Sequence, residues 1–286
     1  RGPVDIVVED NIIVKIQVVG YPGVAIDEKK RPKLKKGGKE LEASGMYLLA
    51  GFIDMHGHIG GVAQGENSDY VFNTGCPSID LAKEVMLNPA LDFDPVKKYG
   101  GVGEIGDWKG EGYLVVMQHP VTTECQMSKK HITSTLSAIH NLNIPTFWFW
   151  PNVDAGADGT SSGIRSYREA HNLSNIYFFK NMEPNDFLKL LKNSKVMVGN
   201  SSAGIRECSY MGVPVVNIGS RQNKRLRSEK VINCLYNKEG IEDAILMQIN
   251  NKHYKPEYLY GDGNSGNNIA NILHDIKLRH HKTISY

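Results

Sequence analysis

The sequence predicts an α/β fold built on a doubly wound parallel sheet, and three observations lead to this prediction. Short apolar, β-rich runs alternate along the chain with segments whose apolar residues recur at helical spacing. Polar and glycine-containing loops separate these runs. Helix boundaries are marked as well, because Pro184 suits a first helical position and Gly212 suits a left-handed helix end. Strands that alternate with helices in this way form a parallel sheet covered on both faces, with right-handed connections.

The expected elements follow one another from about residue 113 onward. The predicted strands cover 113–118, 145–150, 176–179, 195–199 and 215–218. The predicted helices cover 128–141, 164–170, 184–191, 203–211, 241–249 and 268–276. A polar loop containing Gly156, Asp158 and Gly159 is expected after the second strand.

The N-terminal part of the chain has a different pattern. Two β-rich runs within 4–19 are separated by the polar residues 9–11, which predicts a strand, a turn and a second strand. The lysine- and glycine-rich stretch 27–40 is expected to be a solvated loop, and 46–55 a buried strand. We therefore expect a small β-rich segment ahead of the α/β domain.

Charge and composition exclude several classes of protein. The 33 Lys and Arg against 31 Asp and Glu leave a net charge of +2, without the basic excess of a nucleic-acid-binding protein. Hydrophobic residues make up 41% of the chain, as in globular domains, and no apolar run approaches the ~18 residues of a membrane-spanning helix. The four cysteines (76, 125, 208 and 234) form no CxxC pair, which favours a cytoplasmic location.

Polar residues follow several predicted strands, at the sheet edge where such folds bind ligands. His119 follows the first strand and could be a general acid or base, or a loop histidine bonded to a backbone carbonyl. Ser201 and Ser202 follow the fourth strand. Their hydroxyls at a helix start suit a phosphate or diphosphate, although a simple serine N-cap has the same pattern.

Other polar residues extend this pattern. Glu207, in the first turns of the next helix, could accept hydrogen bonds from ribose hydroxyls or be a favourable acid at a helix start. Arg221 follows the last strand and could clamp a phosphate, or belong to a surface basic cluster at 224–227. Asn152 lies in a further polar loop. Together these strand ends favour a site for a phosphorylated, ribose-containing ligand.

Six segments, in order, are VFNTGCPSIDLA (71–82), QHPVTTE (118–124), WPNVDAGADGTSSGIR (150–165), GNSSAGIRE (199–207), GVPVVNIGSRQ (212–222) and YGDGNSG (260–266). Over about 70–278 they resemble the UDP-N-acetylglucosamine 2-epimerases of the hydrolysing type. The resemblance implies the C-terminal, Rossmann-like half of a two-domain glycosyltransferase-B-like architecture. It implies that UDP leaves the sugar as the C2 proton is removed, and that water then adds to the glycal. The products would be UDP and N-acetylmannosamine, a sialic acid precursor.

The resemblance also implies roles for individual residues. His119 corresponds to the active-site histidine, and Glu207 to the acid that binds ribose. The residues implied at the diphosphate are Ser201, Ser202 and Arg221. Asn152 is expected to contact the substrate. No cofactor is implied, the partner is a UDP-sugar, and a homo-oligomer is expected to be possible.

Residues 1–61 resemble instead the start of an amidohydrolase, through GPVDIVVEDNIIVKIQ and GKELEASGMYLLAGFIDMHGHIGG. His56 and His58 are weak metal-site candidates there, because zinc needs three or four ligands and the other histidines show no metal spacing. We expect no functional metal site. The expected organisation is a β-rich segment over 1–61, a junction over 62–99 and a UDP-binding domain over 100–286.

The leading functional prediction is therefore a UDP-sugar 2-epimerase domain that binds UDP. Because the family's N-terminal carboxylate-bearing domain is not recognised here, we expect the chain alone to turn over its substrate poorly. Two alternatives stay open. A metal-dependent amidohydrolase would retain zinc through dialysis, and a non-catalytic nucleotide-binding module would bind UDP without activity even when a complementing domain is supplied.

Overall fold

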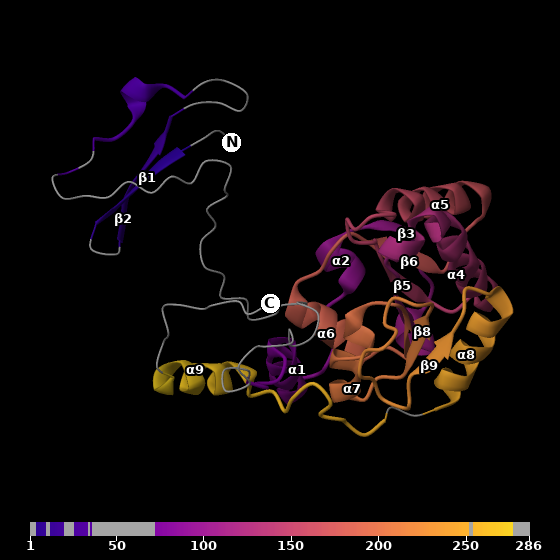
Figure 1. The fold of residues 1–286 in the computed structure, drawn as a ribbon. Helices are drawn as coiled ribbons and strands as arrows, with labels where there is room; N and C mark the ends of the chain where they lie inside the picture. Colours follow the sequence, from indigo (N-terminus) through magenta and orange to yellow (C-terminus); the bar gives the residue numbers. More distant parts are fainter. Residues whose placement is uncertain are drawn as a thin grey trace. The chain divides into compact units, whose positions relative to one another are not determined.

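The structure is a computed structural model that describes residues 4–9, 12–19, 26–33, 35, 72–251 and 254–276. By their internal contacts the residues form two compact units, Arg1–Gly57 and His58–Tyr286. Each unit is described by itself (Figure 1).

The first unit contains the two strands predicted within 4–19. Strands β1 (Val4–Glu9) and β2 (Ile12–Val18) form an antiparallel pair. Beyond them, Arg31 follows the 3-10 helix η1 (Glu28–Lys30), and its Nε lies 2.8 Å from Oδ2 of Asp5. The predicted strand at 46–55 lies outside the described residues, so the amidohydrolase-like interpretation of this segment stays a prediction.

The second unit is built on a seven-stranded sheet with the order β3-β6-β5-β4-β7-β8-β9. Its strands are β3 (Val102–Glu104), β4 (Leu114–Met117), β5 (Thr146–Phe149), β6 (Ile176–Phe179), β7 (Val196–Gly199), β8 (Val215–Ile218) and β9 (Ile232–Cys234). All neighbouring pairs are parallel except β3 with β6. The chain runs from β4 outward to β6 and then returns to β7 on the other side of β4. The predicted Rossmann-like α/β fold is confirmed, with its switch point between β4 and β7.

Helices cover both faces of this sheet, with α4, α5 and α8 on one side and α1, α6 and α7 on the other (Figure 1). The helices are α1 (Pro77–Leu87), α2 (Pro95–Tyr99), α3 (Trp108–Glu111), α4 (Ser128–Leu142), α5 (Ala157–Ala170), α6 (Pro184–Lys192), α7 (Glu207–Met211), α8 (Lys238–Asn250) and α9 (Ser265–Asp275). Along β4, Val115 packs with the α1 side, while Leu114 and Val116 pack with the α4 side. Both faces of the strand are therefore buried, which explains its continuous apolar sequence.

The structure corrects several predicted boundaries. The loop predicted around Asp158 and Gly159 is the first turn of α5, which was missed because its glycines interrupt the apolar periodicity although they pack against α4. The edge strands β3 and β9 were missed because each is three residues long, and β3 is exposed while β9 is only partly buried. Gly101, just before β3, and Gly103 within it lie near β6, where an added Cβ would approach carbonyl oxygens to 2.4 and 2.3 Å.

Helix α1 belongs to the body of this unit. It packs against α6, α7 and α9. Asp80 of α1 accepts hydrogen bonds from the backbone N–H groups of Ser265 and Gly266, which begin α9 (2.9 and 2.7 Å). In the described ranges no helix combines the length and apolar character needed to cross a membrane.

Candidate functional site

The predicted site residues leave the sheet at the carboxyl ends of β4, β5, β7 and β8, beside the switch point. They are His119 after β4, Asn152 after β5, Ser201 and Ser202 after β7, and Arg221 after β8. Because these strands are adjacent and parallel, their carboxyl ends lie at one edge of the sheet. The structure thus brings the predicted strand-end loops together.

Asn200 is the residue that joins the loops after β4, β7 and β8, and sequence reasoning did not single it out. It is fully buried. Its Oδ1 accepts a hydrogen bond from the His119 N–H (2.7 Å), and its Nδ2 donates to the His119 carbonyl (2.9 Å). Its carbonyl oxygen accepts from Gln222 Nε2 (2.7 Å) and Arg221 Nη1 (3.3 Å). Only its place between Gly199 and Ser201, within the serine motif, could have drawn attention to it.

His119 is held by its ring as well as by its backbone. The backbone N–H of Asn152 donates to Nδ1 of His119 at 3.1 Å, so the proton of a neutral ring lies on Nε2. Burial lowers the pKa of His119 to about 4, and the positive charge of Arg221 acts in the same direction, while Asp154 opposes it. The unliganded site therefore holds a neutral imidazole that can donate a hydrogen bond from Nε2.

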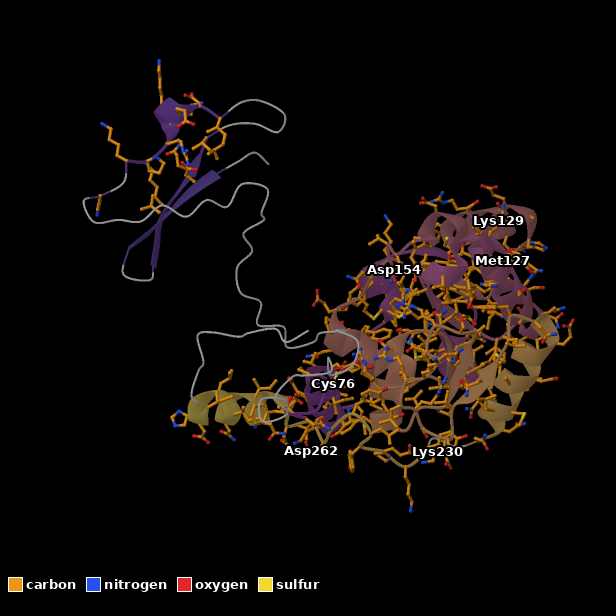
Figure 2. All side chains as sticks on the ribbon, in the orientation of Figure 1. Cys76, Met127, Lys129, Asp154, Lys230 and Asp262 are labelled. Atoms are coloured by element: carbon orange, nitrogen blue, oxygen red, sulfur yellow. The ribbon has the colours of Figure 1, made fainter. Side chains whose placement is uncertain are left out.

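Asp154 links the side chains of Asn152 and Arg221. It lies on the loop between β5 and α5 and is labelled in Figure 2. Its Oδ2 accepts from Asn152 Nδ2 (2.5 Å) and lies 3.5 Å from Arg221 Nη2. Oδ1 of Asn152 is buried and has no hydrogen-bond partner among the described residues. Arg221 thus lies against Asn200 and Asp154 at this sheet edge, and its role as a phosphate clamp stays a prediction.

Of the two predicted serines, Ser201 caps the turn that follows β7. The Ser201 hydroxyl accepts a hydrogen bond from the Ala203 N–H (3.3 Å), which is the N-cap arrangement. The helix expected over 203–211 is divided into a single 3-10 turn, η4 (Ser202–Gly204), and α7. A three-residue turn aligns few peptide dipoles, so the helix dipole expected at this position is weak.

Glu207 is the first residue of α7 and is 6% exposed. Arg206 Nη2 lies 3.4 Å from its Oε1. Its Oε2 is buried without a hydrogen-bond partner among the described residues. A buried carboxylate oxygen without a donor is rare in folded proteins, and it indicates that a ligand or a water supplies the donor.

The loop that carries Arg221 is anchored from its outer side. The Ser220 hydroxyl donates to Oε1 of Glu124, a residue of the segment that leads into α4. Oε2 of Glu124 lies 3.8 Å from His131 Nδ1, and the His131 ring stacks on Tyr236 with a 3.6 Å centroid distance. These contacts connect the carboxyl ends of β4, β8 and β9.

No group of three or more His, Cys, Asp or Glu side chains within 72–251 and the other described ranges is arranged to hold a metal ion. The candidates His56 and His58 lie outside the described residues.

Comparisons with known proteins agree with this architecture. A family model described as UDP-N-acetylglucosamine 2-epimerase matches residues 62–274. The "UDP-N,N'-diacetylbacillosamine 2-epimerase (hydrolyzing)" of Legionella pneumophila is 28% identical over 223 residues, which cover 76% of this chain and 55% of that protein. The "UDP-N-acetylglucosamine 2-epimerase" of Neisseria meningitidis is 32% identical over 184 residues, 64% of this chain and 45% of that protein.

Among solved structures, the Methanocaldococcus jannaschii UDP-GlcNAc 2-epimerase in complex with UDP-GlcNAc and UDP matches with a TM-score of 0.55 at 17% identity. The match covers 73% of this chain and 56% of that one, and at this identity it shows a shared fold. The chain spans about half the length of the curated relatives it matches. Since the family model covers well over half of the residues, the chain belongs to the UDP-N-acetylglucosamine 2-epimerase family.

Proposed function

We propose that the second unit binds the UDP part of UDP-N-acetylglucosamine, or of a related diacetamido UDP-sugar, for a hydrolysing 2-epimerase reaction. The observation that carries this proposal is the hydrogen-bonded convergence of the loops after β4, β7 and β8 on Asn200 at the switch point, with the loop after β5 hydrogen-bonded to His119. The named relatives act on UDP-sugars of both kinds, which supports the choice of nucleotide and leaves either sugar as the substrate.

The proposed chemistry needs hydrogen-bond donors at the leaving group. As the bond between the sugar C1 and the diphosphate oxygen breaks, both bonding electrons stay with UDP and negative charge grows on the diphosphate. Nε2–H of neutral His119, the guanidinium of Arg221 and the hydroxyl of Ser202 are the donors that we assign to that charge. Such donors stabilise the transition state more than the ground state, and so they accelerate the departure of UDP.

The rest of the reaction concerns the sugar. A base takes the C2 proton, a glycal forms, and water adds across its double bond to give N-acetylmannosamine or its diacetamido counterpart. The resemblance assigns the carboxylates for these proton transfers to the family's N-terminal half. The proposed role of the second unit is therefore to hold UDP and to stabilise its departure. Release of N-acetylmannosamine would make the protein a supplier of sialic acid precursor in the cytoplasm, where its scattered free cysteines are expected to stay reduced.

Calorimetric titration of UDP into the full 286-residue chain tests the binding step. We expect saturable binding that weakens roughly 10- to 100-fold in Arg221→Ala, the range of a hydrogen bond to a charged group, and less in Ser202→Ala. Arg165→Ala, on the exposed surface of α5, serves as the control and should bind like the wild type. The proposed site would be overturned if the wild type did not bind UDP, or if the wild type and all variants bound UDP with equal affinity.

The sugar is tested separately. UDP-N-acetylglucosamine and a UDP-diacetamido sugar are each incubated with the chain, and the released UDP and free sugar are measured. Release of UDP together with the C2-epimerised free sugar supports the hydrolysing reaction. Return of an epimerised UDP-sugar would instead show the non-hydrolysing reaction.

A further inference from the structure

Arg206 connects Glu207 to a segment far away in the sequence. Its Nη2 lies 3.4 Å from Oε1 of Glu207, and its Nη1 donates to the thiol sulfur of Cys76 at 3.7 Å. Cys76, labelled in Figure 2, directly precedes α1. The backbone N–H of Arg206 also donates to the carbonyl of Ser202 (3.0 Å). One arginine thus joins the segment before α1, the serine turn and the buried acid.

The Cys76 end of this connection is itself fixed. The Cys76 N–H donates to the carbonyl of Tyr260 (2.8 Å), and its sulfur lies 3.2 Å from the Ser78 hydroxyl. Helix α1 packs directly against α7, which carries Glu207. The guanidinium is therefore directed by groups from two separate parts of the chain.

The burial of Arg206 and Glu207 explains why the carboxylate needs a neighbouring arginine. The side chains of Arg206 and Glu207 are 14% and 8% exposed, so both ions have lost most of their water. An ionised carboxylate in such a place is stable only when a cation and hydrogen-bond donors compensate for the lost water. Of the two carboxylate oxygens of Glu207, Oε1 faces Arg206, and Oε2 has no hydrogen-bond partner among the described residues.

We propose that Arg206 is a positioning residue for ribose recognition. It holds Oε1 of Glu207, so that Oε2 is left to accept hydrogen bonds from the ribose diol, while Cys76 fixes the direction of the guanidinium. The diol offers two donors, and one carboxylate oxygen offers two acceptor positions. This inference rests on the proposed function, because the ribose belongs to the bound UDP.

The test compares two nucleotides that differ only in the diol. UDP and 2′,3′-dideoxy-UDP are titrated by calorimetry into the full chain and into Arg206→Lys, Arg206→Gln and Glu207→Gln. The wild type is expected to prefer UDP roughly 10- to 100-fold, as one or two hydrogen bonds to a charged group predict. Lysine keeps the positive charge but lacks the branched guanidinium that reaches both Cys76 and Glu207. Each glutamine variant removes one charge of the pair. The preference for UDP over 2′,3′-dideoxy-UDP should therefore fall to within about threefold in each variant.

Matched variants separate positioning from general damage. Ser202→Ala should weaken both nucleotides by the same factor and keep the preference, since it concerns the diphosphate. Arg165→Lys, on the surface of α5, should change neither. Cys76→Ala removes the contacts of the sulfur with Arg206 and Ser78 and should reduce the preference about two- to fivefold. Circular dichroism and thermal unfolding show that each variant is folded, and Arg206→Gln provides a second readout if Arg206→Lys is not.

The outcomes are distinct. Loss of the UDP preference with unchanged affinity for dideoxy-UDP supports the proposal. An equal loss of affinity for both nucleotides in the Arg206 variants shows a structural role and overturns it. A wild type that binds both nucleotides equally also overturns it, but leaves the proposed UDP site intact. A wild type that binds neither nucleotide overturns the proposed function and this inference together.

Discussion

The backbone N–H of Asn152 donates a 3.1 Å hydrogen bond to Nδ1 of His119, across the carboxyl ends of two neighbouring strands. A backbone amide can only donate, so the contact requires an unprotonated Nδ1. The proton of neutral His119 is thus directed to Nε2. The tautomer of this side chain is therefore determined by a residue that lies 33 positions further along the chain.

The first prediction concerns the protonation of His119. Burial lowers its pKa to about 4, so the ring should stay neutral from pH 6 to pH 8. The Cε1–H resonance of His119, assigned through the His119→Gln spectrum, should not move in this range. A titration midpoint above pH 6 would contradict the geometry.

The same shift affects stability, and its sign follows from linkage. The unfolded chain binds a proton at this histidine near pH 6.5, whereas the folded chain does so only near pH 4. The free energy of unfolding should therefore fall as the pH falls from about 6.5 to 4, by at most about 1.4 kcal/mol per pH unit for one proton. The His119→Gln variant should lose this part of the pH dependence in urea unfolding. His131→Gln is a needed comparison, because burial lowers the pKa of His131 as well.

The second prediction concerns Asp154, which places a carboxylate against Arg221 in the unliganded site. The proposed diphosphate must share Arg221 with that carboxylate. Asp154→Asn keeps the size and the hydrogen-bonding groups but removes the negative charge, so UDP should bind about two- to fivefold more tightly, as expected for a partly exposed charge pair. Asp158→Asn makes the same charge change at an exposed position of α5 and controls for net charge. Weaker UDP binding in Asp154→Asn alone would show that its charge orients Arg221 for the ligand.

The third prediction concerns Gly219, where the chain leaves β8. Its φ is +75°, and an added Cβ would lie 2.2 Å from ring atoms of Tyr236. Gly219→Ala should therefore destabilise the protein by both backbone strain and overlap, about 2–4 kcal/mol in denaturant unfolding, and weaken UDP binding by displacing the Arg221 loop. Gly100→Ala is the control, since its φ is +62° but nothing lies within 4 Å of the added atom. Equal losses of stability in the two variants would show that Tyr236 moves aside without cost.

The fourth prediction concerns the hydrogen bond between Ser220 and Glu124. It holds the Arg221 loop against the segment that leads into α4. Ser220→Ala should weaken UDP binding about two- to tenfold, because the loop loses one of its anchors, with a loss of stability of about 1 kcal/mol. Glu124→Gln keeps an acceptor oxygen and should retain most of the affinity, whereas Glu124→Ala should resemble Ser220→Ala. The control is Ser166→Ala on the exposed surface of α5, and UDP affinities equal to its value would contradict the prediction.

Much of the fold could be predicted because local sequence controls it. The run 176–179 is apolar at every position and is bounded by polar residues, and it forms β6 with those limits. Pro184 begins α6, and Gly212 adopts the left-handed conformation that ends α7. Burial of apolar side chains and the backbone limits of proline and glycine act within a few residues.

Where local signals were weak, prediction failed. Strand β3 contains one glycine among its three residues and is exposed, so its pairing with β6 has no apolar pattern to predict it. The first turn of α5 has small and polar residues that resemble a loop, and its helix is stabilised by packing against α4.

The sequence by itself determined the central strands β4 to β8 and the helices α4, α6, α8 and α9, and which polar side chains stand at the strand ends. Only the tertiary structure decided how those side chains are used. It places Asn200 as the link between His119 and Arg221, and it brings Cys76 to Arg206 across a separation of 130 residues. The physical reason is that such contacts depend on strand order and helix packing, which arise from the burial of the whole core. The low pKa of His119 likewise follows from burial among several loops and from the nearby charges of Arg221 and Asp154.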